Sequence, residues 1–169
     1  MLKLRPYKDS DAETVAGWLS DEEGFWKWCA GQYKRYPALP EDIRGFYREQ
    51  QADPGFFEMT ALEGVKVVGH LVMRYLDPEQ TDLKFGFIIV DPSVRGKGYG
   101  RQMLTLALRY AFEILRAERV SLGVFENNPA AARCYEGLGF CRTGRYTVHH
   151  LMEEDWKFWE MEYRKEEAV

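Results

Sequence analysis

The chain has 169 residues and a net charge of −4, from 23 Lys and Arg against 27 Asp and Glu. Hydrophobic residues make up 46% of it, which predicts a folded chain, and no apolar run reaches the roughly 18 residues that cross a bilayer. The acidic balance argues against nucleic-acid binding. The N-terminus is charged and lacks the pattern of a signal peptide, which predicts a cytoplasmic protein. The three cysteines are widely spaced and include no CxxC pair, so no metal site is expected.

The first part of the sequence predicts one strand followed by helices. Residues 2–5 alternate apolar and polar, as in a short strand. Asp9 or Ser10 can cap a helix whose apolar residues lie on one face. An aromatic-rich stretch over 25–33 predicts a second helix, and Pro40 begins a third that extends through Tyr47.

Three strands are expected in the middle of the sequence. Residues 56–62 and 66–75 predict a hairpin, with a turn at Glu63-Gly64. Residues 83–90 are nearly all apolar, which predicts a strand buried on both faces. Asp91-Pro92 ends this strand, and a glycine-rich turn follows.

The second half predicts two helices among three strands. Residues 100–115 form the clearest helical pattern, and residues 120–125 a strand. Asn128, followed by Pro129, can cap a helix that runs through Glu136. With two last strands near 140–148 and 156–163, the order of elements predicts an α/β fold of one domain: a mixed, mostly antiparallel central sheet with helices on both faces.

The turn between the apolar strand and the long helix has the composition of an anion site. It contains three alternate glycines, Gly96, Gly98 and Gly100, which let a ligand approach the backbone closely. The helix N-terminus adds unpaired N–H groups and the positive end of the helix dipole. These features predict a phosphate site. Arg95, Lys97 and Arg101 add positive charge there.

The spacing of the turn excludes two common phosphate motifs. A P-loop requires a lysine where Tyr99 follows Gly98, and a dinucleotide fingerprint that starts at Gly96 requires a glycine where Arg101 stands. The pyrophosphate of coenzyme A, bound by successive backbone amides, remains. The alternative is an ordinary tight turn without a ligand.

Two motifs resemble the GCN5-related N-acetyltransferase (GNAT) family. The first motif is residues 95–100, Arg-Gly-Lys-Gly-Tyr-Gly. It matches the family pattern of Arg or Gln, then Gly three residues later, then Gly or Ala two residues after that. The second is Asn128 with Tyr135 seven residues later, followed by Gly139-Phe140. Both stand in the family order and at the family separation, and the resemblance is strong over about residues 66–141 and weak over 1–50.

The resemblance implies the acyl-CoA N-acyltransferase fold, acetyl-CoA as co-substrate without a metal, and direct attack of a primary amine in a ternary complex. The amine can belong to a small molecule, a peptide or a protein N-terminus. Tyr135 would be the general acid that protonates the leaving thiolate. The single domain 1–169 would divide into acceptor-side helices (1–55), the acetyl-CoA-binding core (56–141) and C-terminal strands (142–169). The residues implied to bind the cofactor are Ile88, Ile89, Val90, Arg95, Gly96, Lys97, Gly98, Tyr99, Gly100, Arg101 and Asn128.

The chain departs from its relatives at the general base. Ribosomal-protein alanine acetyltransferases of the family carry a Glu where this chain has Gly123, and many relatives have an acidic residue where Lys84 aligns. Glu126 is the carboxylate nearest to the expected cleft, so it is the candidate base. Transfer of the proton to solvent is the alternative.

The remaining candidates have simpler interpretations. Adjacent strand residues face opposite sides, so His149 and His150 are expected at a strand edge and not around one metal ion. Cys134 is expected to pack, and the acidic turn 153–155 to be solvated, with attraction of a cationic amine as its alternative. The aromatic residues of 26–36 can line an acceptor pocket or pack in the core.

Three questions about function and assembly stay open at this stage. The missing base leaves a catalytically silent acyl-CoA-binding sensor as the alternative function, and a longer acyl chain as an alternative donor. A homodimer through the exposed C-terminal strands is compatible with the sequence.

Overall fold

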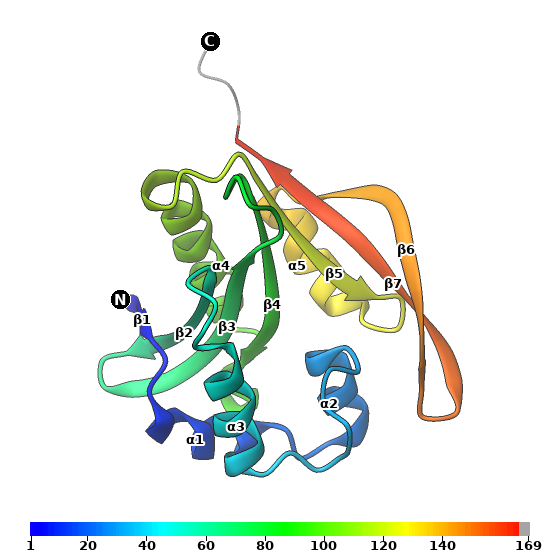
Figure 1. Cartoon of the computed structure of the whole chain (residues 1–169). Coiled ribbons are helices and arrows are strands. Elements are labelled where there is room, and N and C mark those ends of the chain that lie inside the picture. The colour runs from blue at the N-terminus through cyan, green and yellow to red at the C-terminus, as the bar shows by residue number, and fades with distance from the viewer. Residues whose placement is uncertain (166–169) are drawn as a thin grey trace.

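The computed structural model describes residues 1–165 and contains a seven-stranded sheet (Figure 1). Its strands are β1 (Leu2–Pro6), β2 (Phe56–Glu63), β3 (Lys66–Tyr75), β4 (Asp82–Val90), β5 (Arg119–Phe125), β6 (Cys141–Leu151) and β7 (Glu154–Arg164). Their order across the sheet is β1-β2-β3-β4-β5-β7-β6. β4 and β5 are parallel, and the other neighbouring pairs are antiparallel. The predicted mixed, mostly antiparallel sheet is confirmed.

Helices cover both faces of this sheet, as predicted. α1 (Ala12–Trp18), α2 (Glu22–Cys29) and α3 (Pro40–Gln50) lie on one face. α4 (Tyr99–Arg109) and α5 (Pro129–Leu138) lie on the other (Figure 1). Short 3-10 turns at Asp9–Asp11 and Pro92–Val94 precede α1 and α4. Among residues 1–165, no helix is long and apolar enough to span a membrane.

Each face of the sheet has its own hydrophobic core. Leu104 of α4 and Leu122 of β5 belong to the core beneath α4 and α5. Phe25 of α2 and Ile43 of α3 belong to the core on the opposite face, together with Phe87 of β4. Strands β4 and β5 are therefore held between two independently packed layers.

A β-bulge in β4 changes which core its side chains enter. Gly86 pairs with Val72 and Ile89 with His70, so two residues of β4 oppose one residue of β3. Phe87 adopts a positive φ of 49° at this bulge. Before the bulge, buried side chains enter the core beneath α4 and α5, whereas the Phe87 side chain enters the opposite core.

The expectation that residues 83–90 are buried on both faces is wrong. Burial alternates along β4: Leu83 and Phe85 are buried, whereas Lys84, between them, is partly exposed. The exposed side lies over a groove that α1–α3 do not cover, because these helices pack against the end of β4 beyond the bulge. Apolar composition alone therefore overstated the burial.

Two helix ends also differ from the expectation. The helix predicted over 100–115 is α-helical to Arg109 and continues as a π-helical segment over Tyr110–Ile114. The aromatic helix ends at Cys29, because Ala30 takes the left-handed conformation with φ 50°. Tyr33, which the prediction placed on this helix, lies in the following loop.

Candidate functional site

The candidate site begins where β4 and β5 separate. The parallel pairing runs from Asp82 opposite Arg119 to Phe85 opposite Leu122. Beyond this point β4 continues beside β3 and β5 beside β7, so the edge of β4 over 86–90 has no strand partner among the described residues. Backbone N–H and C=O groups require hydrogen-bond partners, and an extended ligand that carries amides can supply them as an added strand would.

The glycine-rich turn gives an open approach to the N-terminus of α4. Gly96 and Gly98 have φ values of 78° and 84°, a conformation that favours glycine. A β-carbon built on Gly96 meets no atom within 4 Å, and one on Gly98 meets Gln102 Nε2 at 4.0 Å. Because the first helical N–H groups have no acceptor within the helix, this open surface fits an anion.

The three predicted cations of the turn have different surroundings. Arg95 and Lys97 are exposed on the turn itself. The Arg101 guanidinium instead donates to the carbonyl of Gly137, with an Nη2–O distance of 3.4 Å. Arg101 therefore links α4 to α5, and Arg95 and Lys97 are the cations that remain for a ligand.

Asn128 begins α5 as predicted. Its side-chain oxygen accepts a hydrogen bond from the backbone N–H of Ala131 at 3.4 Å, and Pro129 occupies the first helical position. Gly139 ends the helix with φ 112°. The cap uses only the oxygen of the Asn128 amide, so its NH₂ group is left for another acceptor.

Tyr135 lies within the core beneath α4 and α5. Its side chain is 7% exposed, and its ring is 6.1 Å from that of Phe140. Burial raises the pKa of the Tyr135 hydroxyl well above its usual value of about 10. The phenol therefore stays protonated at neutral pH and can donate a proton.

The structure brings three of the predicted segments together. Ile88 and Val90 at the end of β4, Tyr99 at the start of α4, and Tyr135 of α5 belong to one hydrophobic cluster. Glu126, the candidate base, is exposed just after β5, where its N–H donates to the carbonyl of Lys157 at 2.9 Å.

A groove of about 560 Å³ lies beneath β6, beside the last paired residues of β4 and β5. Its base includes Lys84 of β4 together with Ser121 and Gly123 of β5. Burial, and then the charge of Arg74, lower the pKa of Lys84. The other lining residues are Leu76, Leu122, Gly144, Arg145, Tyr146, Thr147, Phe158 and Glu160.

The prediction for the two adjacent histidines is confirmed, because they face different neighbours. The His149 ring lies 5.5 Å from that of Phe125 and 5.2 Å from that of Phe158, whereas His150 contacts Asp155 at 2.9 Å. Burial and the charge of Lys84 lower the pKa of His149, so its imidazole is neutral at neutral pH. The neutral imidazole of His149 can accept a proton, a role that the sequence did not indicate for either of the two adjacent histidines. Its position near Phe125 depends on the pairing of β6 with β7 and of β7 with β5.

Core packing accounts for most of the aromatic cluster of α2 and its following loop. The rings of Trp28 and Tyr33 stack at 5.4 Å, and that of Phe87 lies 5.0 Å from Trp28. The indole N–H of Trp28 and the hydroxyl of Tyr33 are buried without a hydrogen-bond partner in the described part of the chain. These two polar groups lie close to Phe87, at the bulge of β4.

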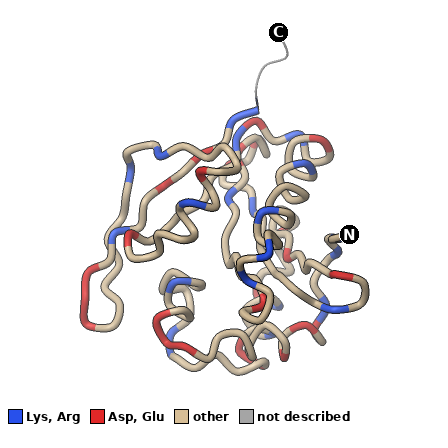
Figure 2. Tube along the Cα trace, turned by 180° about the vertical axis from the view of Figure 1, so that it is seen from behind, with Lys and Arg blue, Asp and Glu red and all other residues tan. Residues whose placement is uncertain are grey.

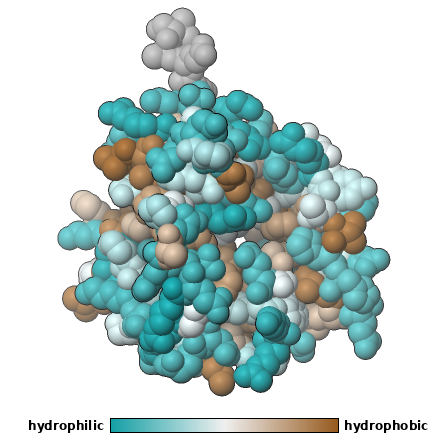
Figure 3. Space-filling model, viewed as in Figure 1, coloured by the Kyte–Doolittle hydropathy of each residue, from teal (hydrophilic) through white to brown (hydrophobic). Residues whose placement is uncertain are grey.

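The charged and apolar surface residues are dispersed. Basic and acidic residues alternate along much of the chain, and the acidic turn 153–155 lies exposed at the tip of the β6–β7 hairpin (Figure 2). The face seen in Figure 1 is largely hydrophilic, with isolated hydrophobic residues (Figure 3).

Cys134 is half-buried, and burial raises the pKa of its thiol. Within residues 1–165 there is no cluster of ligands for a metal ion.

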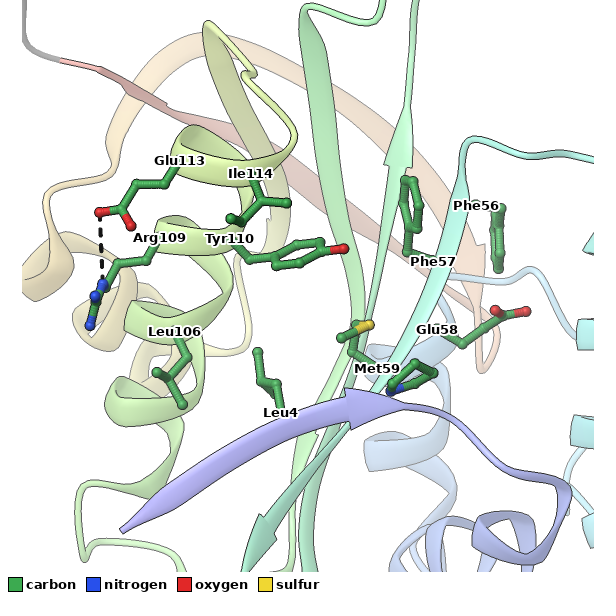
Figure 4. A pocket seen from close by; sticks show the side chains of 11 residues that line it. Leu4, Phe56, Phe57, Glu58, Met59, Leu106, Arg109, Tyr110, Glu113 and Ile114 are labelled. Atoms are coloured by element: carbon green, nitrogen blue, oxygen red, sulfur yellow. Dashed lines mark ion pairs between the residues drawn. The ribbon is translucent and has the colours of Figure 1, made fainter.

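A second cavity, of about 570 Å³, lies between the β1–β2 edge and the end of α4 (Figure 4). Leu4, Met59 and Tyr110 line it, and an Arg109–Glu113 ion pair of 3.8 Å lies at its side. None of the predicted site residues lines this cavity, so it has no part in the candidate site.

Comparisons with known proteins agree with this geometry. Residues 1–141 match the model of the acetyltransferase (GNAT) domain. A spermidine N(1)-acetyltransferase of Vibrio cholerae is 40% identical over 67 residues, covering 40% of this chain and 36% of that protein. A mycothiol acetyltransferase of Thermobispora bispora is 36% identical over 105 residues, covering 60% of this chain and 35% of that protein. The alignments thus span about a third of these curated relatives.

A solved structure gives the same fold over nearly the whole length. The crystal structure of spermidine N-acetyltransferase from Vibrio cholerae, in complex with CoA and spermine, superposes with a TM-score of 0.82. It is 20% identical in sequence, and the superposition covers 96% of this chain and 95% of that one. At this identity the likeness establishes the fold alone.

Proposed function

The chain belongs to the GNAT acetyltransferase family, and we propose that it transfers an acetyl group from acetyl-CoA to a primary amine. The amine can belong to a small molecule, a peptide or a protein N-terminus. The observation that carries this proposal is the junction of an unpaired β4 edge with an open glycine turn at a helix N-terminus. This junction fits a ligand that has both an amide-bearing arm and a pyrophosphate.

The cofactor-binding residues are assigned by chemistry. Backbone groups of β4 over 88–90 would pair with the pantetheine arm, and the NH₂ group of Asn128 would donate to it. The amides of 96–101 would bind the pyrophosphate, with the side chains of Arg95 and Lys97 beside them. Bound acetyl-CoA supplies the thioester that the amine attacks.

Tyr135 is the proposed general acid. Its hydroxyl is protonated at neutral pH, because burial raises its pKa. A thiol has a pKa of roughly 8.5, so a neighbouring donor stabilises the departing thiolate. Glu126 is the proposed base for the proton of the attacking ammonium, and His149 is the competing acceptor.

The N-terminal helices over 1–55 are proposed to form the acceptor side, 56–141 the acetyl-CoA-binding core and 142–169 the C-terminal strands. A homodimer through β6 is part of the proposal, because this edge strand exposes Tyr146 and Val148, which are 49% and 55% accessible. An exposed edge strand can pair with a second copy across a two-fold axis.

A thiol-release assay with acetyl-CoA and a panel of primary amines tests the function. Release of coenzyme A that depends on the amine supports an acetyltransferase. Tight binding of acetyl-CoA without release on any amine would instead identify a catalytically silent sensor. Turnover of propionyl-CoA and butyryl-CoA in the same assay defines the length of acyl chain accepted.

A further inference from the structure

The groove beneath β6 reaches the point where β4 and β5 separate. Lys84 pairs with Ser121, and the next pair, Phe85 with Leu122, is the last of the parallel ladder. Gly123, the first residue beyond it, also lines the groove. The Leu122 side chain enters the core beneath α4 and α5, so Ser121 and Gly123 face the opposite side of the sheet. A molecule in this groove therefore approaches the separated strands from the face opposite α5.

Lys84 is the cation at the base of this groove, and Arg145 and Glu160 are its other charged lining residues. Its ammonium lies 5.7 Å from the centre of the Phe158 ring, and no carboxylate in the described chain is within ion-pair distance of it. Glu160 is the carboxylate that lines the groove, but it already binds Arg119 at 2.9 Å and Arg145 at 2.5 Å. Lys84 therefore has no ion-pair partner in the described chain, and the charge of Glu160 acts on it only from a greater distance.

A partly buried ammonium without a counter-ion is stabilised by an anion brought close to it. A second ammonium in the same place is repelled. We infer that the amine substrate carries an anionic group, a carboxylate or a phosphate, which Lys84 binds in this groove. This inference rests on the proposed function and narrows its substrate class: an amine that is also an anion, in preference to a polyamine.

The test uses four amines of similar length, γ-aminobutyrate, aminopropyl phosphate, γ-aminobutyramide and putrescine, at constant ionic strength. We expect the kcat/KM of the preferred anionic amine to exceed that of the neutral amide by roughly tenfold, as for one charge-assisted hydrogen bond. Comparing kcat/KM for γ-aminobutyrate and aminopropyl phosphate shows whether a carboxylate or a phosphate is preferred. Lys84→Met should abolish the preference through KM, Lys84→Arg should retain it, and Lys84→Glu should shift it to putrescine.

A matched control is Lys3→Met, on the edge strand β1, which should leave the order of preference unchanged. A melting-temperature shift with acetyl-CoA verifies that each variant is folded. Preference of the wild-type enzyme for putrescine, or an unchanged order in Lys84→Glu, would overturn the inference and leave the acetyltransferase standing. Absence of turnover on every amine would count against the proposed function. In that case, calorimetric titration of the four amines into the CoA complex tests the binding role of Lys84 separately. Equal affinities of the four amines would overturn the inference that Lys84 binds an anionic group.

Discussion

The ring of Phe158 lies directly over Gly123. A β-carbon added to Gly123 would be 2.0 Å from Cζ of Phe158, which is closer than real contacts allow. Gly123 is the position at which some relatives place a catalytic glutamate. Phe158 therefore explains why this chain has no side chain there, and its ring lines the groove beneath β6 at this point.

Gly123→Ala tests this relationship. We expect the free energy of unfolding to fall by about 1–3 kcal/mol, the usual cost of an added methyl group in a packed site. Denaturant titration measures it, and Gly123→Ala combined with Phe158→Ala should be less destabilised than the sum of the two single variants. Unchanged stability in Gly123→Ala would contradict the contact.

Tyr135→Phe tests the general acid. We expect kcat to fall by about a hundredfold, because the leaving thiolate loses its proton donor. The KM for acetyl-CoA should change little, since the phenyl ring still fills the core. The raised pKa of Tyr135 means that the wild-type enzyme should show no loss of this donor up to about pH 10. An unchanged kcat in the variant would assign Tyr135 to packing.

Glu126→Gln tests the base. We expect kcat/KM for the amine to fall by about a hundredfold, because the attacking ammonium loses the carboxylate that takes its proton. His149→Gln is the comparison, because its neutral imidazole is the competing acceptor. Full activity of Glu126→Gln together with a loss in His149→Gln would move the role to His149. Full activity of both would leave solvent as the acceptor.

Because His70 is buried, we expect the free energy of unfolding to decrease in mild acid. It is 0% exposed, its Nε2 lies 2.5 Å from the Tyr47 hydroxyl, and burial lowers its pKa from 6.5 to about 4, although the charge of Asp11 opposes this. The unfolded chain binds a proton that the folded chain excludes, so the contribution is complete above pH 6.5 and is lost as the pH falls towards 4. The loss amounts to about 3 kcal/mol at most.

Urea titrations at pH 7 and pH 4.5 measure this effect. His70→Gln, which cannot gain a proton, should lose less stability between the two pH values than the wild-type chain. An equal loss in both proteins would show that His70 does not cause the acid sensitivity.

Local patterns were sufficient to predict much of the fold and the cofactor side of the site. The cap at Asn128 and the glycines before α4 act through a few neighbouring residues, so their signals lie in short stretches of sequence. The hairpin of β2 and β3 was predicted for the same reason.

Long-range contacts could not be predicted in this way. The bulge at Phe87 depends on the register with β3, and the contact between Phe158 and Gly123 depends on β7 pairing with β5. Lys84 could be identified as a departure from relatives, but its lack of a counter-ion depends on Arg119 and Arg145 binding Glu160. The features proposed for the acceptor side therefore depend on contacts between residues that lie far apart in the sequence.

Thermal unfolding with and without acetyl-CoA tests the central assignment most directly, comparing the wild-type chain with Gly98→Trp and Gly64→Trp. Both glycines have positive φ and open surroundings, but Gly64 lies in the turn between β2 and β3, away from the proposed site. At a concentration of 100 times its Kd, acetyl-CoA should stabilise the wild-type chain and Gly64→Trp by about 2.7 kcal/mol, and Gly98→Trp far less. No stabilisation of the wild-type chain at millimolar acetyl-CoA, or an equal one in Gly98→Trp, would contradict the assignment of coenzyme A to this turn.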